Sequence, residues 1–138
     1  MQMPREIDKR MLAPCGINCI LCYGHLTRKK ICPGCLSGDE NKSSACLNCK
    51  IKLCAEERGY TYCFECGEFP CKRVKNIDKR YRLKYNSNLI ENLLYAKERG
   101  IEALLKKDRK NWKCDECGGV ISMHSGKCSE CGAPFQRK

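Results

Sequence analysis

The sequence has few of the large apolar side chains from which a protein core is normally built. Only 3 Phe and 1 Trp occur among its 138 residues, whereas 15 residues are cysteine. A chain with so few bulky apolar groups needs a covalent or metal crosslink to offset the entropy lost when its backbone is ordered. We therefore expect a small fold that depends on its cysteines.

The chain also lacks a segment that would carry it to or across a membrane. Charged residues stand where the apolar stretch of a signal peptide would begin, at Arg5, Glu6, Asp8, Lys9 and Arg10. No later apolar run reaches the length of a membrane span. Disulfides form mainly in oxidising compartments reached by secretion. We therefore expect a cytoplasmic protein with reduced cysteines and no membrane contact.

The sequence offers little for catalysis, since it has only two histidines and no Ser, His and acid pattern. Enzymatic activity is not expected unless a metal site keeps an open position. The odd number of cysteines and the frequent Cys-x-x-Cys pairs, which wrap two thiolates round one ion, favour metal binding over disulfides.

A formal net charge of +11 would make this a basic protein. That count treats every cysteine as neutral, whereas zinc bound to four thiolates carries −2, so four such sites would remove roughly eight charges. The overall charge is therefore weak support for nucleic-acid binding.

Cysteines and charges divide the chain into three segments, for which we predict a small metal-stabilised α+β fold. Residues 1–71 hold eleven cysteines and form a cysteine-rich, multi-metal module. Residues 72–112 contain no cysteine and have 13 Lys/Arg against 5 Asp/Glu, a net charge of +8, and we expect them to be a basic helical segment. Residues 113–138 hold the last four cysteines as a zinc ribbon.

The middle segment has the pattern of two helices. Asn88 and Glu91 have the spacing of a capping box, and Gly100 stands where the first helix would end. The apolar residues expected to face inward are Leu89, Ile90, Leu93 and Leu94, then Ile101, Leu104 and Leu105 in the second helix.

Residues 72–84 are the most basic stretch, with Tyr81 and the following Tyr85 beside the cations. Interleaved aromatics and cations can stack on bases and neutralise phosphates, although a solvated helix face would have the same composition. The residues expected to contact nucleic acid or a protein partner are Lys72, Arg73, Lys75, Lys79, Arg80, Arg82 and Lys84.

The C-terminal cysteines have the spacing C-x2-C-x10-C-x2-C, and a glycine follows each pair. Glycine allows a tight turn with positive φ, so that backbone amides can point at the thiolates. We predict a zinc ribbon with a short hairpin strand at Val120, Ile121 and Met123, although the same turns could hold a single iron, as in rubredoxins. His124 is not expected to be a ligand. The predicted ligands are Cys114, Cys117, Cys128 and Cys131.

The N-terminal cysteines form four clusters of closely spaced residues. With His25 they offer twelve ligands, the number that three tetrahedral zinc ions need, for about four ions in all. Cys32/Cys35 with Cys46/Cys49 reproduces the ribbon spacing, but a cross-braced pairing fits equally well. The predicted ligands are Cys15, Cys19, Cys22, His25, Cys32, Cys35, Cys46, Cys49, Cys54, Cys63, Cys66 and Cys71.

Three alternatives to structural zinc remain open for this module. Cys15, Cys19 and Cys22 have the cluster spacing of radical S-adenosylmethionine enzymes, but the large barrel that such chemistry needs has no counterpart here. An iron-sulfur cluster held by these three and a fourth cysteine is a stronger alternative. A redox pair at Cys32 and Cys35 would need a βαβ setting, which the sequence does not show.

The N-terminal motifs together resemble the cysteine-rich family known as domain of unknown function 3795. The resemblance covers residues 11–75 and rests on Cys15-Gly-Ile-Asn-Cys19-Ile-Leu-Cys22, Cys32-Pro-Gly-Cys35, Cys46 to Cys54 and Cys63-Phe-Glu-Cys66-Gly-Glu-Phe-Pro-Cys71. The C-terminal ribbon looks like an extension found in some members. The resemblance implies prokaryotic, often anaerobic hosts and metal binding, with no established activity.

These observations predict a zinc-binding protein that serves as a binding or adaptor module for nucleic acid or a protein partner. The alternative is an iron-sulfur redox or metal-handling protein of an anaerobic prokaryote.

Overall fold

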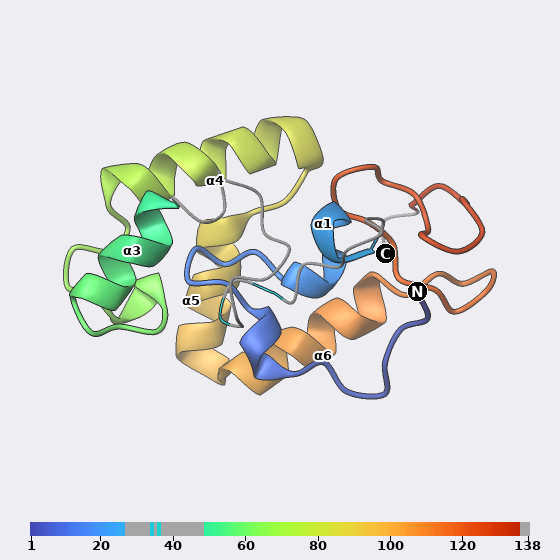
Figure 1. Cartoon of the computed structure of the whole chain (residues 1–138), viewed down its shortest axis with the longest axis horizontal. Helices are drawn as coiled ribbons and strands as arrows, with labels where there is room; N and C mark the ends of the chain where they lie inside the picture. The colour runs from blue at the N-terminus through green and yellow to red at the C-terminus, as the bar shows by residue number, and fades with distance from the viewer. Residues whose placement is uncertain (27–33, 35, 37–48, 136–138) are drawn as a thin grey trace.

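The computed structural model of the chain describes residues 1–26, 34, 36 and 49–135 (Figure 1). In this part the named elements are all helices or helical turns, and none of the helices has both the length and the apolar character needed to cross a bilayer. They are η1 (Lys9–Met11), η2 (Cys19–Leu21), α1 (Tyr23–Leu26), α3 (Lys50–Glu57), η3 (Cys63–Glu65), α4 (Lys72–Tyr85), α5 (Leu89–Arg99) and α6 (Ile101–Asn111).

The expected strand component is small. Within the described residues, antiparallel pairing occurs only as isolated bridges, including Lys113 with Val120 and Ile121 with Cys128. The predicted hairpin strand is reduced to such single pairs because tight turns on both sides leave no room for a longer ladder. The α+β class is therefore not confirmed, and the described chain is mainly helical.

The two helices predicted for the middle segment are confirmed as α5 and α6. They meet at Gly100, whose φ of 98° is a conformation that other residues rarely adopt. Leu89 and Leu93 are fully buried, but Leu94 is 48% exposed, so its predicted inward position is wrong. The reason is that α5 buries one stripe at helical spacing, and Leu94 lies outside it.

The N-terminus of α5 is capped by a residue from the preceding helix. Asn88 makes no capping bond to the backbone and instead donates from Nδ2 to Glu91 Oε2 (2.9 Å). Asp78 of α4 accepts from the Ile90 amide (3.0 Å) and from Arg82 Nε (2.8 Å). The predicted capping box is therefore wrong, because a carboxylate from α4 already occupies the positive end of α5.

The main core combines residues from all three segments of the sequence. Leu12, Leu89, Leu104 and Val120 belong to one buried cluster. Helix α5 packs against both α4 and α6, while α3 packs against α4 and η1 against α6 (Figure 1). The cysteine-rich regions are thus attached to a helical centre that has an apolar core of its own.

Candidate metal centre

Twelve of the predicted cysteine ligands lie in the described residues, and none of these twelve forms a disulfide. Cys32, Cys35 and Cys46 lie outside the described part of the chain. The described cysteines fall into three regions: around η2, between α3 and α4, and near the C-terminus.

The cysteines around η2 lie on the helical centre. Cys15 and Cys19 are each only 5% exposed. Asn18 holds the turn by accepting from the Ile20 amide (3.2 Å) and by donating to buried Asp108 of α6 (3.1 Å). Burial raises the pKa of Asp108 to about 6, although the bond from Asn18 acts in the opposite direction. His25 lies in α1, the short helix that follows Cys22.

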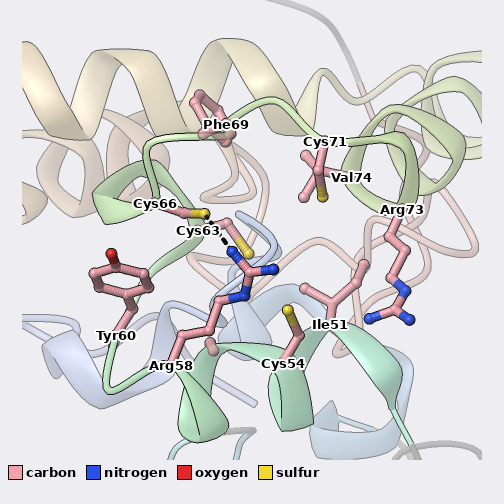
Figure 2. Close-up of a pocket in the computed structure, with 11 residues that line it drawn as sticks. Ile51, Cys54, Arg58, Tyr60, Cys63, Cys66, Phe69, Cys71, Arg73 and Val74 are labelled. Atoms are coloured by element: carbon pink, nitrogen blue, oxygen red, sulfur yellow. Dashed lines mark hydrogen bonds between the residues drawn. The ribbon is translucent and has the colours of Figure 1, made fainter.

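A second set of cysteines faces a cavity of about 30 Å³ between α3, η3 and the start of α4. Figure 2 shows their sulfur atoms pointing into the same central space. We call them the cavity group: Cys54, Cys63, Cys66 and Cys71.

The cavity group has a cation beside it. Arg58 follows directly after α3, and its Nη1 donates to Cys66 Sγ (3.7 Å) and to Glu68 Oε2 (3.1 Å). Glu68 and then the thiolates of Cys54 and Cys66 raise the pKa of Arg58. Burial raises the pKa of the Cys63 thiol to about 12, with smaller contributions from the neighbouring thiolates. Without an ion, Cys63 is therefore a protonated thiol and a poor nucleophile at neutral pH.

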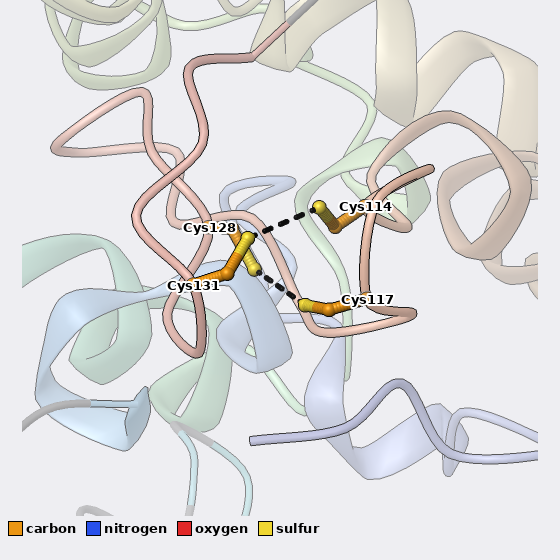
Figure 3. A group of neighbouring side chains, drawn as sticks. All are labelled: Cys114, Cys117, Cys128 and Cys131. Atoms are coloured by element: carbon orange, nitrogen blue, oxygen red, sulfur yellow. Dashed lines mark hydrogen bonds between the residues drawn. The ribbon is translucent and has the colours of Figure 1, made fainter.

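The C-terminal cysteines converge most closely. Their four sulfur atoms all lie within 4.8 Å of one another, and no other described group of Cys, His, Asp or Glu is this compact. The sulfurs of Cys114 and Cys131 are 3.7 Å apart and those of Cys117 and Cys128 are 3.5 Å apart (Figure 3). We call these four residues the C-terminal group.

Two matching turns produce this convergence. The amide of Gly118 donates to the Cys114 carbonyl (2.9 Å), and the amide of Gly132 donates to the Cys128 carbonyl (3.1 Å). Both glycines have a φ of 75°, as the sequence predicted from their positions after each pair. The Glu130 amide also points at Cys128 Sγ (3.4 Å). Each turn therefore brings its two thiols to one side of the backbone.

The four thiols share protons unequally. Burial would raise the pKa of Cys128, but the amides of Cys131 and Glu130 and the thiols of Cys117 and Cys114 lower it to about 7. The Gly119 amide lowers the pKa of Cys117, but desolvation and the neighbouring thiols outweigh it and raise the value to about 12. One thiolate therefore forms near neutral pH, and a bound cation would replace the remaining protons.

Close packing supports the C-terminal group on one side. A Cβ added at Gly119 would lie 2.8 Å from Cys128 Sγ and 2.8 Å from Glu130 Cγ, so only glycine fits there. Trp112 and Phe135 stack with centroids 4.4 Å apart and flank the small cluster of buried residues around Cys114 and Cys128. The sequence analysis missed Gly119, although the Cys-Gly-Gly run was a signal for it.

This arrangement could hold one metal ion. Four thiolates at this separation match the tetrahedral shell that zinc or a single iron takes from cysteine, in which sulfurs lie about 3.8 Å apart. His124 is not one of the four. It lies against the rings of Tyr81 and Tyr85, with Nε2 3.2 Å from the Tyr81 hydroxyl, and burial lowers its pKa.

The predicted contact residues are all exposed on α4. Tyr81, however, is buried and bonded to His124, and burial followed by the thiolates of Cys15 and Cys22 raises its pKa. Tyr81 is therefore not available for stacking on a base, and the stacking role expected for it from the sequence is not supported. Arg82 also has a structural role, because it pairs with Asp78.

The comparisons with known proteins concern the N-terminal part of the chain. No curated protein and no solved structure matches the sequence. The family described as protein of unknown function (DUF3795) matches residues 11–76, which include the cavity group but not the C-terminal group. This match supports the resemblance drawn from the cysteine motifs, and it identifies residues 11–76 as a segment similar to a cysteine-rich family without an assigned activity.

Proposed function

We propose that this chain is a zinc-binding protein in which the C-terminal group holds one structural zinc ion as a zinc ribbon. The convergence of four sulfur atoms within 4.8 Å carries the proposal. Four thiolates fill a tetrahedral shell and leave no open position for a substrate. The role of this ion is therefore to hold the fold rather than to catalyse a reaction.

The proposal extends to the N-terminal cysteines, which with His25 would bind further zinc ions, for about four in the whole chain. Thiols that must stay reduced to bind metal fit a cytoplasmic protein. The alternative occupant of the N-terminal module is an iron-sulfur cluster, which four cysteines could also hold.

We further propose that the protein is a binding or adaptor module that uses α4. All seven cations of this helix are exposed, whereas Val74, Asp78 and Tyr81 are buried. Such a face can neutralise phosphates or meet an acidic protein surface.

Elemental analysis tests the metal. Full-length protein purified without oxygen is assayed for zinc, iron and sulfide, beside a variant carrying Cys114→Ser and Cys128→Ser. We expect zinc without sulfide in the wild type and one zinc fewer in the variant. If the wild type contains iron that the variant lacks, the ion of the C-terminal group is iron instead of zinc. If both proteins contain iron and sulfide, the iron-sulfur cluster is the better account of the N-terminal module.

Salt dependence tests the partner. Binding to fluorescent 20-nucleotide DNA and RNA should weaken about a hundredfold between 50 and 200 mM salt if four cations contact phosphates. Reversing Lys75, Lys79 and Lys84 to Glu should abolish binding, and Arg82 is left intact because it holds Asp78. A control reverses three exposed lysines of α5 and α6: Lys97, Lys106 and Lys110. Equal loss in both variants would mean that α4 is not the specific contact surface, and no binding by the wild type would leave a protein partner.

A further inference from the structure

Residues 46–71 contain the spacing C-x2-C-x4-C twice, as the triplets Cys46/Cys49/Cys54 and Cys63/Cys66/Cys71, but the structure groups these cysteines differently. Cys54 is in the first triplet, yet it faces the same cavity as the whole second triplet. Cys49 lines another cavity, with Ile77 and Arg80 of α4. Cys49 also contributes to the raised pKa of Cys63, but it does not line this cavity, which is faced by the four thiols of the cavity group.

The turn that carries Cys63 and Cys66 has the same geometry as the turn that carries Cys19 and Cys22. The amide of Cys66 donates to the Cys63 carbonyl (3.1 Å) in η3, and the amide of Cys22 makes the same bond to Cys19 (3.1 Å) in η2. Cys54 comes from α3 and Cys71 is the N-cap of α4.

The size and the charge of the cavity indicate its occupant. A cavity of this size has room for a few water-sized groups, so a single ion fits it. Four thiolates on one divalent cation leave a charge of −2. The guanidinium of Arg58 lies beside the sulfurs and is fixed by Glu68, so part of that charge is already offset (Figure 2).

We infer that Cys54, Cys63, Cys66 and Cys71 together bind one divalent metal ion, at a second site separate from the C-terminal group. Binding exchanges the thiol protons for the cation and involves no change of oxidation state. The sulfurs lie farther apart than those of the C-terminal group, so the ion draws them together. Cys49 belongs to a different site.

Counting ions on substituted chains tests this grouping. Native mass spectrometry of full-length protein refolded with Zn²⁺ gives the number of ions per chain. Cys54→Ser and Cys71→Ser should each remove one ion, and the double variant should also lack only one. Cys49→Ser with Cys54→Ser should lack two. A double Cys54/Cys71 variant that lacks two ions or none, or a Cys49/Cys54 variant that lacks only one, would overturn the inference.

A measurement on the unsubstituted chain avoids the risk that these variants fail to fold. A chelator removes part of the zinc from the loaded protein under reducing conditions, and N-ethylmaleimide then alkylates the cysteines that have lost their ion. Mass spectrometry selects chains that have lost one ion and identifies which of their cysteines are alkylated. We expect Cys54, Cys63, Cys66 and Cys71 to be alkylated together or not at all. Molecules with two of them alkylated and two protected would contradict the site. The C-terminal cysteines, read in the same spectra, report separately on the proposed zinc ribbon.

Discussion

The two cysteine groups of the described chain reach their geometry by different routes. In the C-terminal group, two identical short turns place four sulfurs within 4.8 Å of one another without an ion. In the cavity group, the thiols come from α3, η3 and the start of α4, and their sulfurs lie farther apart around Arg58. Local sequence is thus sufficient to assemble the first site, whereas the second depends on how two helices pack.

The two groups also differ in what supports them when no ion is bound. Around the C-terminal group, Cys114, Ile121 and Cys128 form a small buried cluster with Trp112 and Phe135 beside it, whereas Val120 and Met123 belong to the main core. The cavity group lies beside α4, which packs on the helical core through the buried Tyr81. The small cluster around the sulfurs has little apolar burial of its own, so we expect it to depend on its metal more than the helices do.

Removal of metal should therefore have the largest effect at the C-terminus. Structural zinc contributes about 10 kcal/mol or more to the folding of small domains. A strong chelator should unfold residues 113–135 while α5 and α6 stay helical. Hydrogen exchange would show protection lost at Ile121 and Cys128 and retained at Leu93 and Leu104. Equal loss in both regions would mean that the helices also depend on metal.

Acid should affect the helical core and the metal sites in opposite directions. Burial raises the pKa of Asp108 from 3.8 to about 6, so its ionised form destabilises the fold. Stability from this group is present below about pH 4 and is lost as pH rises to about 6, whereas thiolate sites lose their metal as pH falls. Asp108→Asn should raise the free energy of unfolding at pH 7.5 by up to about 3 kcal/mol.

Urea denaturation measures the free energy of unfolding of the wild type and of Asp108→Asn at pH 7.5 and at pH 5. At each pH the difference between the two proteins cancels the contribution of the metal sites, because both proteins contain them. The gain should shrink at pH 5. Glu102→Gln, at an exposed position of the same helix, is the control and should change little. An equal effect of Asp108→Asn at both pH values would exclude titration of Asp108 as the cause.

A single methyl group tests how tightly the C-terminal group is packed. Gly119→Ala would place Cβ 2.8 Å from Cys128 Sγ. Overpacking of this kind costs about 1–3 kcal/mol, and we expect weaker zinc binding in a competition assay with a chromogenic chelator. Gly67→Ala, which has open space and lies near the cavity group, is the matched control. Unchanged affinity in Gly119→Ala would show that the turn can shift without disturbing the sulfurs.

The smallest effect should come from the cation beside the cavity group. Arg58→Ala should weaken binding at that site a few-fold and increase its salt sensitivity, because an exposed charge interacts weakly with its partners. Arg58→Lys should restore most of the affinity. If Arg58→Ala binds the ion more tightly, the guanidinium competes with the metal for the thiolates instead of offsetting their charge.

Sequence patterns predicted best what short segments determine by themselves. The C-x2-C-G turns and the break between α5 and α6 at Gly100 follow from the conformational freedom of glycine and were found correctly. The capping box at Asn88 and Glu91 was wrong because Asp78, ten residues earlier, takes over the cap. The spacing of residues within one helix gives no information about a capping side chain that comes from another helix.

The cavity group and Asp108 could not be found from sequence for the same reason. The spacing left the partners of Cys54 open, and only the packing of α3 on α4 places it at the same cavity as Cys63 and Cys71. Asp108 looks like one more charge on a basic helix, yet it is 7% exposed and bonded to Asn18, ninety residues away. Helical periodicity gave no sign of that contact.

The most direct test of two separate metal sites is a zinc count by native mass spectrometry on full-length chains purified without oxygen. One variant carries Cys114→Ser and Cys128→Ser, a second carries Cys54→Ser and Cys71→Ser, and a third combines all four. We expect each double variant to lack one zinc ion and the quadruple variant to lack two. A quadruple variant that lacks only one ion, or double variants that keep every ion of the wild type, would contradict the account.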